Sequence, residues 1–334
     1  MSRTRGTGGT AVVLLLAVVA VAFLLSVRFG SVEITLSEIF DVFAGRGSET
    51  NHLIVTELRI PRALLALLVG GGLALAGGVF QALLRNPLAE PYIMGISGGA
   101  ATGAVLVLAV GWVTTVSWAL PLAAFAGAAV AILLVFGVAL SADRRMDVRV
   151  LLLSGVVVGA FFSACIALIF ALSNAATLRS AVIWMMGSLG GASWQTVAIV
   201  AAYTLPLSAV LIGLARALDL LAIGEETARY LGTRVERVKR TAYGVASLIA
   251  AAGVAFAGVI GFVGLVIPHG VRIIVGSNHR LLLPLSFLAG GAFLILADLL
   301  ARTVAAPAEI PIGVITAFVG VPAFLLLLRR SLRG

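Results

Sequence analysis

The sequence contains very few of the residues that build disulfides, metal sites and nucleotide-binding loops. Cys165 is the single cysteine among 334 residues, so no internal disulfide can form and no cysteine-based metal site is expected. Lys239 is the single lysine, and Arg240 directly follows it where the loop G-x-x-x-x-G-K-[ST] needs Ser or Thr, so that loop is absent. The three histidines, His52, His269 and His279, have no ligand partner at helical spacing. We therefore expect no catalytic residue, no metal site and no cofactor in this chain.

Charge is also scarce, while long apolar runs are abundant. Charged residues make up 11% of the chain and hydrophobic residues 61%, with a mean hydropathy of +1.16. Soluble domains carry about 25% charged residues. The apolar runs are roughly 17 to 25 residues long, which is the length that crosses a bilayer as a helix, whereas a membrane barrel would show short alternating segments. The composition predicts an all-α polytopic membrane protein, with residues 1–334 forming one transmembrane domain.

Hydropathy predicts about ten spans. The first span has a basic start but no small-residue cleavage site before Arg28, so we interpret it as an anchor rather than a cleaved signal peptide. The eighth is the weakest, because Pro268 interrupts it and Arg272 lies inside it. The expected spans are Ala11–Val27, Ala63–Leu84, Ile93–Val110, Val116–Leu140, Val150–Leu172, Trp194–Leu214, Thr241–Ala257, Val259–Val275, Leu281–Leu300 and Ile312–Leu328.

Two features of the spans concern their packing. Small residues recur at every fourth position in two places, and such spacing lets helix backbones approach closely in lipid. In addition, the proline-broken segment Gly78–Pro91 resembles Gly258–Arg272 in the second half, after spans that run in opposite directions. Such an echo is typical of the inverted repeats of transporters, and chance similarity between glycine-rich spans is the alternative. The small-residue sets are Gly70, Ala74 and Gly78, and Gly95, Gly99 and Gly103.

The basic residues indicate the orientation of the chain. With the amino terminus inside, 17 of the 23 Lys and Arg residues fall on the cytoplasmic side and 6 on the outer side, which is the bias that the positive-inside rule describes. Both termini are then cytoplasmic. The net charge of +9 follows from this topology, so we expect membrane lipid and no nucleic acid as a partner.

The spans contain almost no ionisable groups that could drive transport. Ion-coupled carriers keep such groups inside the membrane, where a buried charge is costly. Asp298 lies near the outer end of the ninth span, and no second acid pairs with it at helical spacing. Because the nucleotide-binding loop is absent as well, ATP would have to be bound by a separate subunit. An ion-coupled secondary transporter stays the alternative of another class, and a membrane enzyme is a third.

The longest polar segment, residues 216–240, falls on the cytoplasmic side of this topology. Gly224 interrupts its helical pattern, and Gly232 can end a second short helix in the left-handed conformation. Acids at the start of that helix favour its positive end. Two short helices on a membrane surface suit a docking element for a partner or a solvated connector, and the residues alone leave both open. In the second helix we place Glu225 and Glu226 in the first turn and Ala228 and Leu231 on one face.

The outer side has few basic residues, and three of them stand at the ends of spans. Arg59 and Arg62 flank Pro61, a spacing that suits the first turn of a helix and lets both side chains point the same way. Arg302 lies at the outer end of the ninth span. The residues alone suit either docking contacts or arginines that reach the membrane interface. Between the fifth and sixth spans, Ser173–Trp194 predicts a short helix at the outer mouth.

Five motifs, in this order along nearly the whole chain, resemble the FecCD family, the permease subunits of ABC importers for iron-siderophores, haem and cobalamin. The resemblance implies the type II importer permease fold with an inverted internal repeat, in a bacterial cytoplasmic membrane. It implies three kinds of partner: a second copy of the chain in a homodimer, two ATPase subunits that bind ATP and Mg²⁺, and a solute-binding protein outside. The motifs are RIPRALLALLVGGGLALAGGVFQALLRNPLAEPYIMGISGGA (Arg59–Ala100), WMMGSLGGASW (Trp184–Trp194), GEETARYLG (Gly224–Gly232), GFVGLVIPHGVR (Gly261–Arg272) and EIPIGVITAFVGVPAFLLLLRR (Glu309–Arg330).

The resemblance also implies roles for particular residues. The stretch Gly224–Gly232 would be a coupling helix in a cleft of the ATPase, the outer arginines would pair with acids of the binding protein, and the loop after the second span would narrow the inner exit. An iron-siderophore complex is the first expected cargo, with haem or cobalamin as alternatives for the same machinery. The residues concerned are Gly224, Glu225, Glu226, Ala228, Arg229, Leu231 and Gly232 for coupling, Arg59, Arg62 and Arg302 for docking, and Asn86 and Leu88 for the gate.

Overall fold

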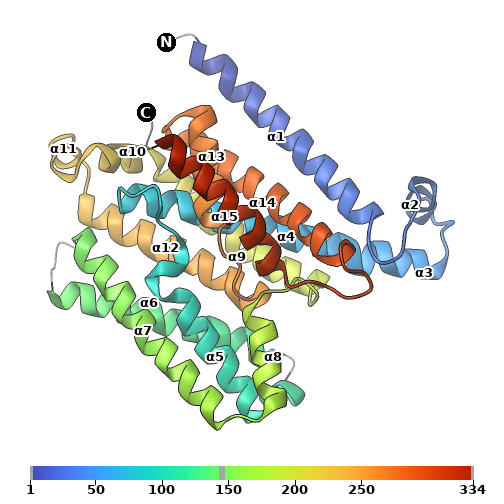
Figure 1. The fold of residues 1–334 in the computed structure, drawn as a ribbon. Coiled ribbons are helices and arrows are strands. Elements are labelled where there is room, and N and C mark those ends of the chain that lie inside the picture. The colour runs from blue at the N-terminus through green and yellow to red at the C-terminus, as the bar shows by residue number, and fades with distance from the viewer. Residues whose placement is uncertain (1–2, 117, 143–146, 332–334) are drawn as a thin grey trace.

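The described part of the chain is built from helices. The computed structural model describes residues 3–116, 118–142 and 147–331, and no strand occurs within them. Figure 1 shows a bundle of long helices with short helices at its ends. The α-helices are α1 (Arg3–Arg28), α2 (Leu36–Phe43), α3 (Glu49–His52), α4 (Ile60–Leu83), α5 (Ile96–Val110), α6 (Ala119–Ala142), α7 (Val148–Leu172), α8 (Ala175–Met185), α9 (Trp194–Gly213), α10 (Ala215–Ile223), α11 (Glu225–Tyr230), α12 (Val235–Ala257), α13 (Val263–Val275), α14 (His279–Thr303) and α15 (Ile312–Ser331). A π-helix, η1 (Leu53–Arg59), and two 3₁₀-helices, η2 (Pro91–Met94) and η3 (Trp112–Thr114), complete the set.

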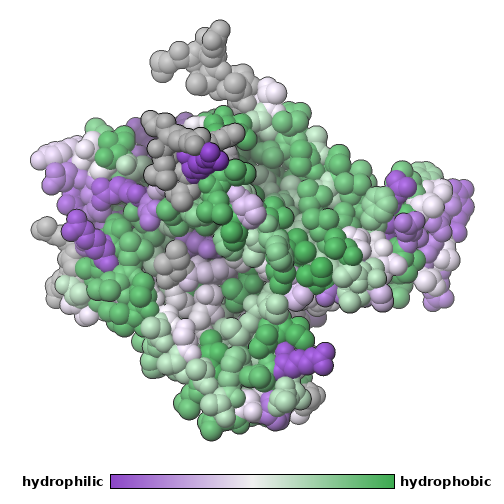
Figure 2. All heavy atoms as spheres, viewed as in Figure 1, coloured by the Kyte–Doolittle hydropathy of each residue, from purple (hydrophilic) through white to green (hydrophobic). Residues whose placement is uncertain are grey.

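Apolar helices occupy the positions of all ten predicted spans among the described residues, and residue 117 of the predicted fourth span lies outside them. Seven helices are long and apolar enough to cross a membrane, and the shorter apolar helices Ile96–Val110, Val263–Val275 and Ile312–Leu326 occupy the other three predicted spans. Figure 2 shows an apolar surface between two polar ends, one over α10 and α11 and one over α2 and α3. The start of α1 and the end of α15 both lie toward the end that carries α10 and α11 (Figure 1).

The eighth span begins later than predicted, at Val263 instead of Val259. Gly258 and Phe262 adopt positive φ angles of 71° and 69°, so the helix that ends at Ala257 cannot continue directly into α13. Irregular backbone at membrane depth is tolerated where protein buries it or where it lines a cavity. We therefore expect the interruption between α12 and α13 to be buried by protein or to line a cavity inside the bundle.

The helix that carries Arg59 and Arg62 begins earlier than predicted. Pro61 stands in the first turn of α4, as predicted, but α3 and η1 precede that turn, so helical backbone continues without a break through Glu49–Leu83. Proline has no N–H and would disturb a regular α-helix. The wider turns of η1 end at Arg59, two residues before Pro61, so the π-helical stretch leads into the proline and accommodates its missing hydrogen bond.

The long helix α4 forms the centre of the bundle and packs against α9, α12, α13 and α14. Gly70 faces Gly290 of α14, and Gly77 faces Gly264 of α13, both so closely that an added Cβ would overlap the facing backbone. Close packing of this kind needs glycine, because dispersion contacts between backbones hold helices together in lipid. The second predicted set packs against α6 in the same way, at Gly99 and Gly103.

The predicted short helix between the fifth and sixth spans is confirmed as α8, which packs against α5. The side chain of Asn174 caps it by accepting a hydrogen bond from Thr177 N at 2.9 Å. After α8 the chain reaches Trp194, whose ring N–H donates to Thr56 O at 3.0 Å. The segment is thus tied to η1, which leads into α4.

Candidate functional site

The polar segment consists of two short helices, α10 and α11, as the sequence predicted. Gly224 separates them with a φ of 153°, and Gly232 ends α11 with a φ of 81°. Both hydrogen bonds of a Schellman stop are present: Thr233 N donates to Ala228 O at 2.9 Å, and Gly232 N donates to Arg229 O at 2.9 Å. These bonds satisfy the last carbonyl groups of α11 and end the helix at a defined residue.

The charges of α11 bind it to the bundle on one side. Glu225 Oε1 accepts a hydrogen bond from Nζ of the buried Lys239 in α12 at 2.9 Å. The same carboxylate oxygen lies 3.7 Å from Nη2 of Arg85, in the loop after α4. Arg229 pairs with Glu236 in the first turn of α12. Glu225 therefore connects α11 to α12 and to the loop after α4 within the same chain.

The opposite side of this segment presents bulky apolar side chains to solvent. Tyr230 is 91% exposed, Ile223 71% and Leu231 62%, and Glu226 is exposed beside them. Ala228 is fully buried, so the prediction that it shares a face with Leu231 is wrong. The helix ends at Tyr230, and the turn that follows directs Leu231 outward. Sequence reasoning missed Tyr230 and Ile223; a bulky apolar residue next to each helix break is the signal that could have found them.

A second link fixes α10 to the start of α14. Asp219 Oδ1 accepts a hydrogen bond from His279 N at 2.9 Å and lies 2.6 Å from His279 Nδ1. His279 is buried at the first position of α14. The polar segment is thus attached to two spanning helices, to α12 through Lys239 and to α14 through His279, so a displacement of the segment reaches both.

The loop after α4 forms a tight turn. The helix ends there, as the sequence predicted from the two X-Pro steps. Asn86 Oδ1 accepts a hydrogen bond from Leu88 N at 2.9 Å, a short-range bond that favours a turn. Both residues are exposed, while the next residue, Ala89, is buried. The structure places Asn86 and Leu88 on this turn, and their role as a gate stays a prediction.

The two segments whose sequences echo each other meet inside the bundle. Glu90 Oε1, at the end of this loop, accepts a hydrogen bond from Phe262 N at 2.7 Å. Next to it, Ile260 N donates to the hydroxyl oxygen of Tyr92 at 3.5 Å. The interruption between α12 and α13 is therefore held by residues of the loop and η2. Sequence reasoning missed Glu90, although a carboxylate directly before the proline that leads back into the membrane was a usable signal.

Beside this contact lies an apolar hollow of about 610 Å³, open to the surface. It is formed by the interruption before α13, the end of α8 and the face of α15. The helix α13 is 13 residues long, so at about 1.5 Å per residue Phe262 lies roughly 20 Å from its far end. If the far end of α13 marks one edge of the hydrocarbon core, which is about 30 Å thick, the hollow lies inside that core. Its lining includes Met185, Met186, Phe262, Val314, Phe318 and Pro322.

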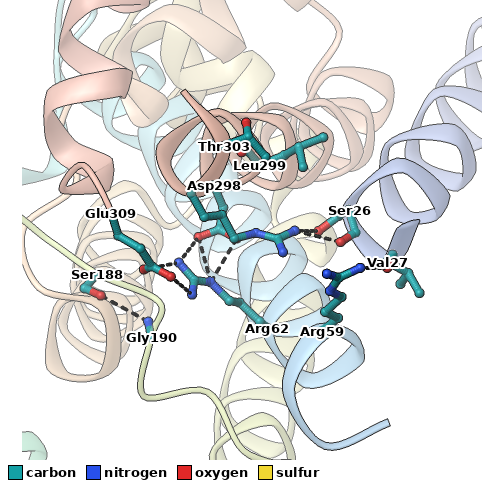
Figure 3. A network of polar contacts seen from close by, with 11 residues as sticks. Ser26, Val27, Arg59, Arg62, Ser188, Gly190, Asp298, Leu299, Thr303 and Glu309 are labelled. Carbon is teal, nitrogen blue, oxygen red and sulfur yellow. Dashed lines mark hydrogen bonds and ion pairs between the residues drawn. The ribbon is translucent and has the colours of Figure 1, made fainter. Parts of the chain in front are cut away.

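A cluster of ion pairs occupies the outer end of α4 and α14 (Figure 3). Nε of Arg62 lies 3.0 Å from both oxygens of Asp298, and its terminal nitrogens bond the two oxygens of Glu309 at 3.0 and 2.9 Å. Arg302, one helical turn beyond Asp298, donates to Oδ2 at 3.1 Å. Asp298 is 1% exposed and is neutralised by two guanidinium groups. It is therefore not a free ion-coupling acid.

On its other side, the cluster donates hydrogen bonds to the carbonyl oxygens at the carboxyl end of α1. The last carbonyl groups of a helix lack partners within it, and the two buried arginines supply donors. The prediction that Arg59 and Arg62 point the same way is wrong, because Arg59 turns toward α1 and Arg62 toward α14. Arg302 Nη2 donates to Ser26 O at 2.7 Å. Arg59 donates to the carbonyl oxygens of Val27 and Arg28 at 2.7 Å each, and to that of Val32.

The docking residues predicted from the resemblance therefore occupy an internal network. Arg59 and Arg302 are buried, which corrects the expectation of exposed guanidinium groups, and docking through them stays a prediction. The part of the cluster that reaches the surface is the pair Arg62–Glu309, in which the Glu309 side chain is 49% exposed. Hydrogen bonds from Arg62 hold the pKa of Glu309 below its ordinary value.

Comparison with known proteins identifies the family. A model described as the FecCD transport family matches residues 16–330. The chain is 44% identical over 287 residues to the cobalamin import system permease protein BtuC of Halobacterium salinarum, covering 86% of this chain and 76% of that protein. It is 39% identical over 283 residues to the hemin transport system permease protein HmuU of Yersinia pestis, covering 82% of each. Both relatives are permease proteins of import or transport systems by name.

A solved structure shows the same fold. It is described as an inward-facing conformation of a metal-chelate type ABC transporter and superposes with a TM-score of 0.86 at 31% identity, covering 95% of this chain and 97% of that chain. The predicted all-α, type II importer permease fold is thereby confirmed, and so is the resemblance on which it was based. With the polar segment, the interrupted spans and these matches, the chain belongs to the FecCD transport family, as a membrane-spanning permease subunit of an ABC importer.

Proposed function

We propose that this chain forms a homodimer that imports a metal-chelate cargo across the bacterial cytoplasmic membrane, with an iron-siderophore complex as the first cargo to test. Two ATPase subunits on the cytoplasmic side bind ATP and Mg²⁺ and supply the energy. A solute-binding protein delivers the cargo outside. The observation that carries the proposal is the compact helix α11 with its exposed apolar tip, in a chain that has no nucleotide-binding loop of its own.

The contact with the ATPase is centred on this tip. Interfaces derive most of their affinity from a few aromatic and large apolar residues in a desolvated centre. Tyr230, Ile223 and Leu231 have that character, and they are exposed in the isolated chain. Glu226 and Arg229 lie at the edge, and the glycines at either end of α11 keep the tip compact. Ala228 and Glu225 support the contact from inside.

The cargo class follows from the hollow and from the relatives. A hollow lined by apolar side chains suits a bulky cargo that binds weakly on its way, with specificity supplied by the binding protein. The relatives named above are a cobalamin and a hemin permease, so cobalamin and haem are tested beside the siderophore. A second copy of the chain, packed against the exposed apolar face of α15, would turn the open hollow into an enclosed path.

Reconstitution tests the function directly. The chain is inserted into liposomes with its ATPase and its binding protein, and uptake of a ferric siderophore, haem and cobalamin is measured with and without ATP. We expect ATP-dependent uptake of one cargo, and none by the chain without the ATPase. Accumulation by the isolated chain, or uptake that collapses with the proton gradient while ATP is maintained, would show an ion-coupled carrier instead.

A further inference from the structure

One short loop, residues 85–91, connects helix α11 of the polar segment to the apolar hollow. At its first end, Arg85 Nη2 lies 3.7 Å from Oε1 of Glu225 in α11. At its other end, Glu90 Oε1 accepts the hydrogen bond from Phe262 N at 2.7 Å. The turn between them is held by the bond from Leu88 N to Asn86 Oδ1. Loop 85–91 is therefore attached at both ends, to the element that would meet the ATPase and to the backbone beside the hollow.

Phe262 is held in an unusual conformation at that second end. Its φ of 69° is in the left-handed region, which a bulky side chain rarely adopts without support from its surroundings. Its ring contacts the helix α15 so closely that an added Cβ on Gly320 would overlap it. Because Phe262 also lines the hollow, a change of its backbone conformation changes the shape of the hollow.

The carboxylate of Glu90 stabilises this conformation of Phe262 by accepting the hydrogen bond from Phe262 N. A hydrogen bond from a backbone N–H to a carboxylate is stronger than one to a neutral acceptor, and more so away from water. The Glu90 carboxylate also lies near the positive end of α13, where a negative charge is favoured. Loss of this hydrogen bond would leave Phe262 N without this acceptor and would let the strained residue relax.

We propose that Glu90 is a positioning residue that holds Phe262 in the left-handed conformation, and that loop 85–91 transmits a displacement of α11 to it. The shape of the hollow then follows the state of the ATPase. This inference rests on the proposed function, since it assumes that an ATPase moves α11. The inference adds to that function the residue, Glu90, that links a displacement of α11 to the shape of the hollow.

The test uses the complete complex in nanodiscs, with the parent chain carrying Cys165→Ser and Val314→Cys. The rate at which a thiol reagent modifies the introduced cysteine in the hollow is measured without nucleotide and with ATP trapped. We expect at least a threefold difference between the two states in the parent. Glu90→Ala should remove that difference while ATP hydrolysis persists, and it should lower uptake per ATP at least tenfold.

Two variants separate positioning from a general loss of structure. Glu90→Gln keeps an acceptor oxygen and should restore most of the labelling difference. Glu38→Ala removes a carboxylate that caps α2 and accepts a hydrogen bond from Asn51, away from loop 85–91, and it should behave like the parent. Arg85→Ala should also reduce the difference, and the double variant Arg85→Ala, Glu90→Ala should be no worse than Glu90→Ala alone, because both act through one loop.

The outcomes are distinguishable. A parent complex that assembles but transports none of the three cargoes contradicts the proposed function, while the labelling readout needs no cargo and still judges the inference. A Glu90→Ala complex with the labelling difference and uptake per ATP of the parent overturns the inference alone. A loss of the difference that Glu90→Gln does not restore, with ATP hydrolysis also lost, would mean that Glu90 serves only folding and would overturn it as well.

Discussion

The carboxylate of Glu225 accepts a hydrogen bond from Nζ of Lys239 at 2.9 Å, which joins the short helix α11 to the spanning helix α12. Lys239 is buried, and Glu225 is partly covered. A buried ammonium group needs its partner, because an unpaired charge away from water is costly. This contact is one of the links between the polar segment and the bundle, and it assigns Glu225 a role inside the chain.

Replacement of Glu225 should destabilise the chain. Glu225→Ala leaves Lys239 without this carboxylate and should cost about 1–2 kcal/mol, since the pair is partly accessible to water. Thermal unfolding of the purified chain in detergent measures the change. The matched control Glu226→Ala removes an exposed charge from the neighbouring position and should stay within about 0.5 kcal/mol of the parent. Equal effects of the two variants would contradict the internal role of Glu225.

Replacement of Tyr230 should affect the ATPase contact and leave the fold intact. The side chain is 91% exposed, so Tyr230→Ala removes little packing within the chain. As an aromatic centre of an interface it should contribute at least about 2 kcal/mol, roughly thirtyfold in Kd. Binding of the ATPase to the chain in nanodiscs gives the affinity. Tyr230→Phe, which keeps the ring, should bind nearly as well as the parent, and parent-like binding by Tyr230→Ala would exclude this residue from the interface.

Neutralisation of Asp298 should destabilise the outer cluster. Asp298→Asn leaves the guanidinium groups of Arg62 and Arg302 close together without the buried carboxylate between them, at a cost of about 3–5 kcal/mol. Glu309→Gln removes a half-exposed partner of Arg62 and should cost less than about 1 kcal/mol. Thermal unfolding of both variants compares them. If Asp298 were an ion-coupling acid instead, its neutralisation would abolish gradient-driven uptake with little loss of stability.

The pair Arg62–Glu309 should make stability depend on pH in the acid range. The pKa of Glu309 is lowered from its ordinary value of 4.5, mainly by the hydrogen bonds from Arg62. Because the pKa in the folded state lies below that in the unfolded state, the stabilisation is present above pH 4.5 and is lost as the pH falls through the lowered value. The melting temperatures of the parent and Glu309→Gln, compared between pH 3 and 7, should converge at the acid end. A constant gap over that range would contradict the shift.

Two glycines in spanning helices should respond in opposite ways to alanine. Gly77 faces the backbone of Gly264 so closely that an added Cβ overlaps it, so Gly77→Ala should destabilise by about 1–3 kcal/mol or prevent folding. Gly244 has no other atom within 4 Å of an added Cβ, so Gly244→Ala should be neutral or stabilise by up to about 1 kcal/mol. Thermal unfolding and the yield of monodisperse protein distinguish the two.

The spans, helix ends and close helix contacts could be predicted from the sequence because each is determined by residues that are near one another in the chain. The apolar runs determine the spans, because a helix in lipid must satisfy its own backbone groups and expose apolar side chains. The stop at Gly232 and the break at Gly224 follow from residues that alone adopt such φ angles readily. The close approach at Gly70 follows from a spacing of four. Family membership was recognisable for the same reason, since its motifs are short runs of neighbouring residues.

The partners of the polar side chains could not be predicted in this way. Arg62 finds Asp298 across a separation of 236 residues, and Glu90 finds Phe262 across 172. Such pairs depend on which helices lie side by side and on how each helix is rotated. The π-helical stretch before Pro61 also changes where the side chains at its end point, which no hydropathy pattern reveals.

By itself, the sequence determined that this protein crosses the membrane about ten times, carries a glycine-bounded polar segment, and has no nucleotide-binding loop. Only the tertiary structure decided that the outer arginines close the end of α1, that Tyr230 forms the exposed tip, and that Glu90 meets the interruption before α13. The physical reason is that hydropathy and glycine conformation act within a few residues, whereas charge pairs and hollows exist only after distant helices have packed.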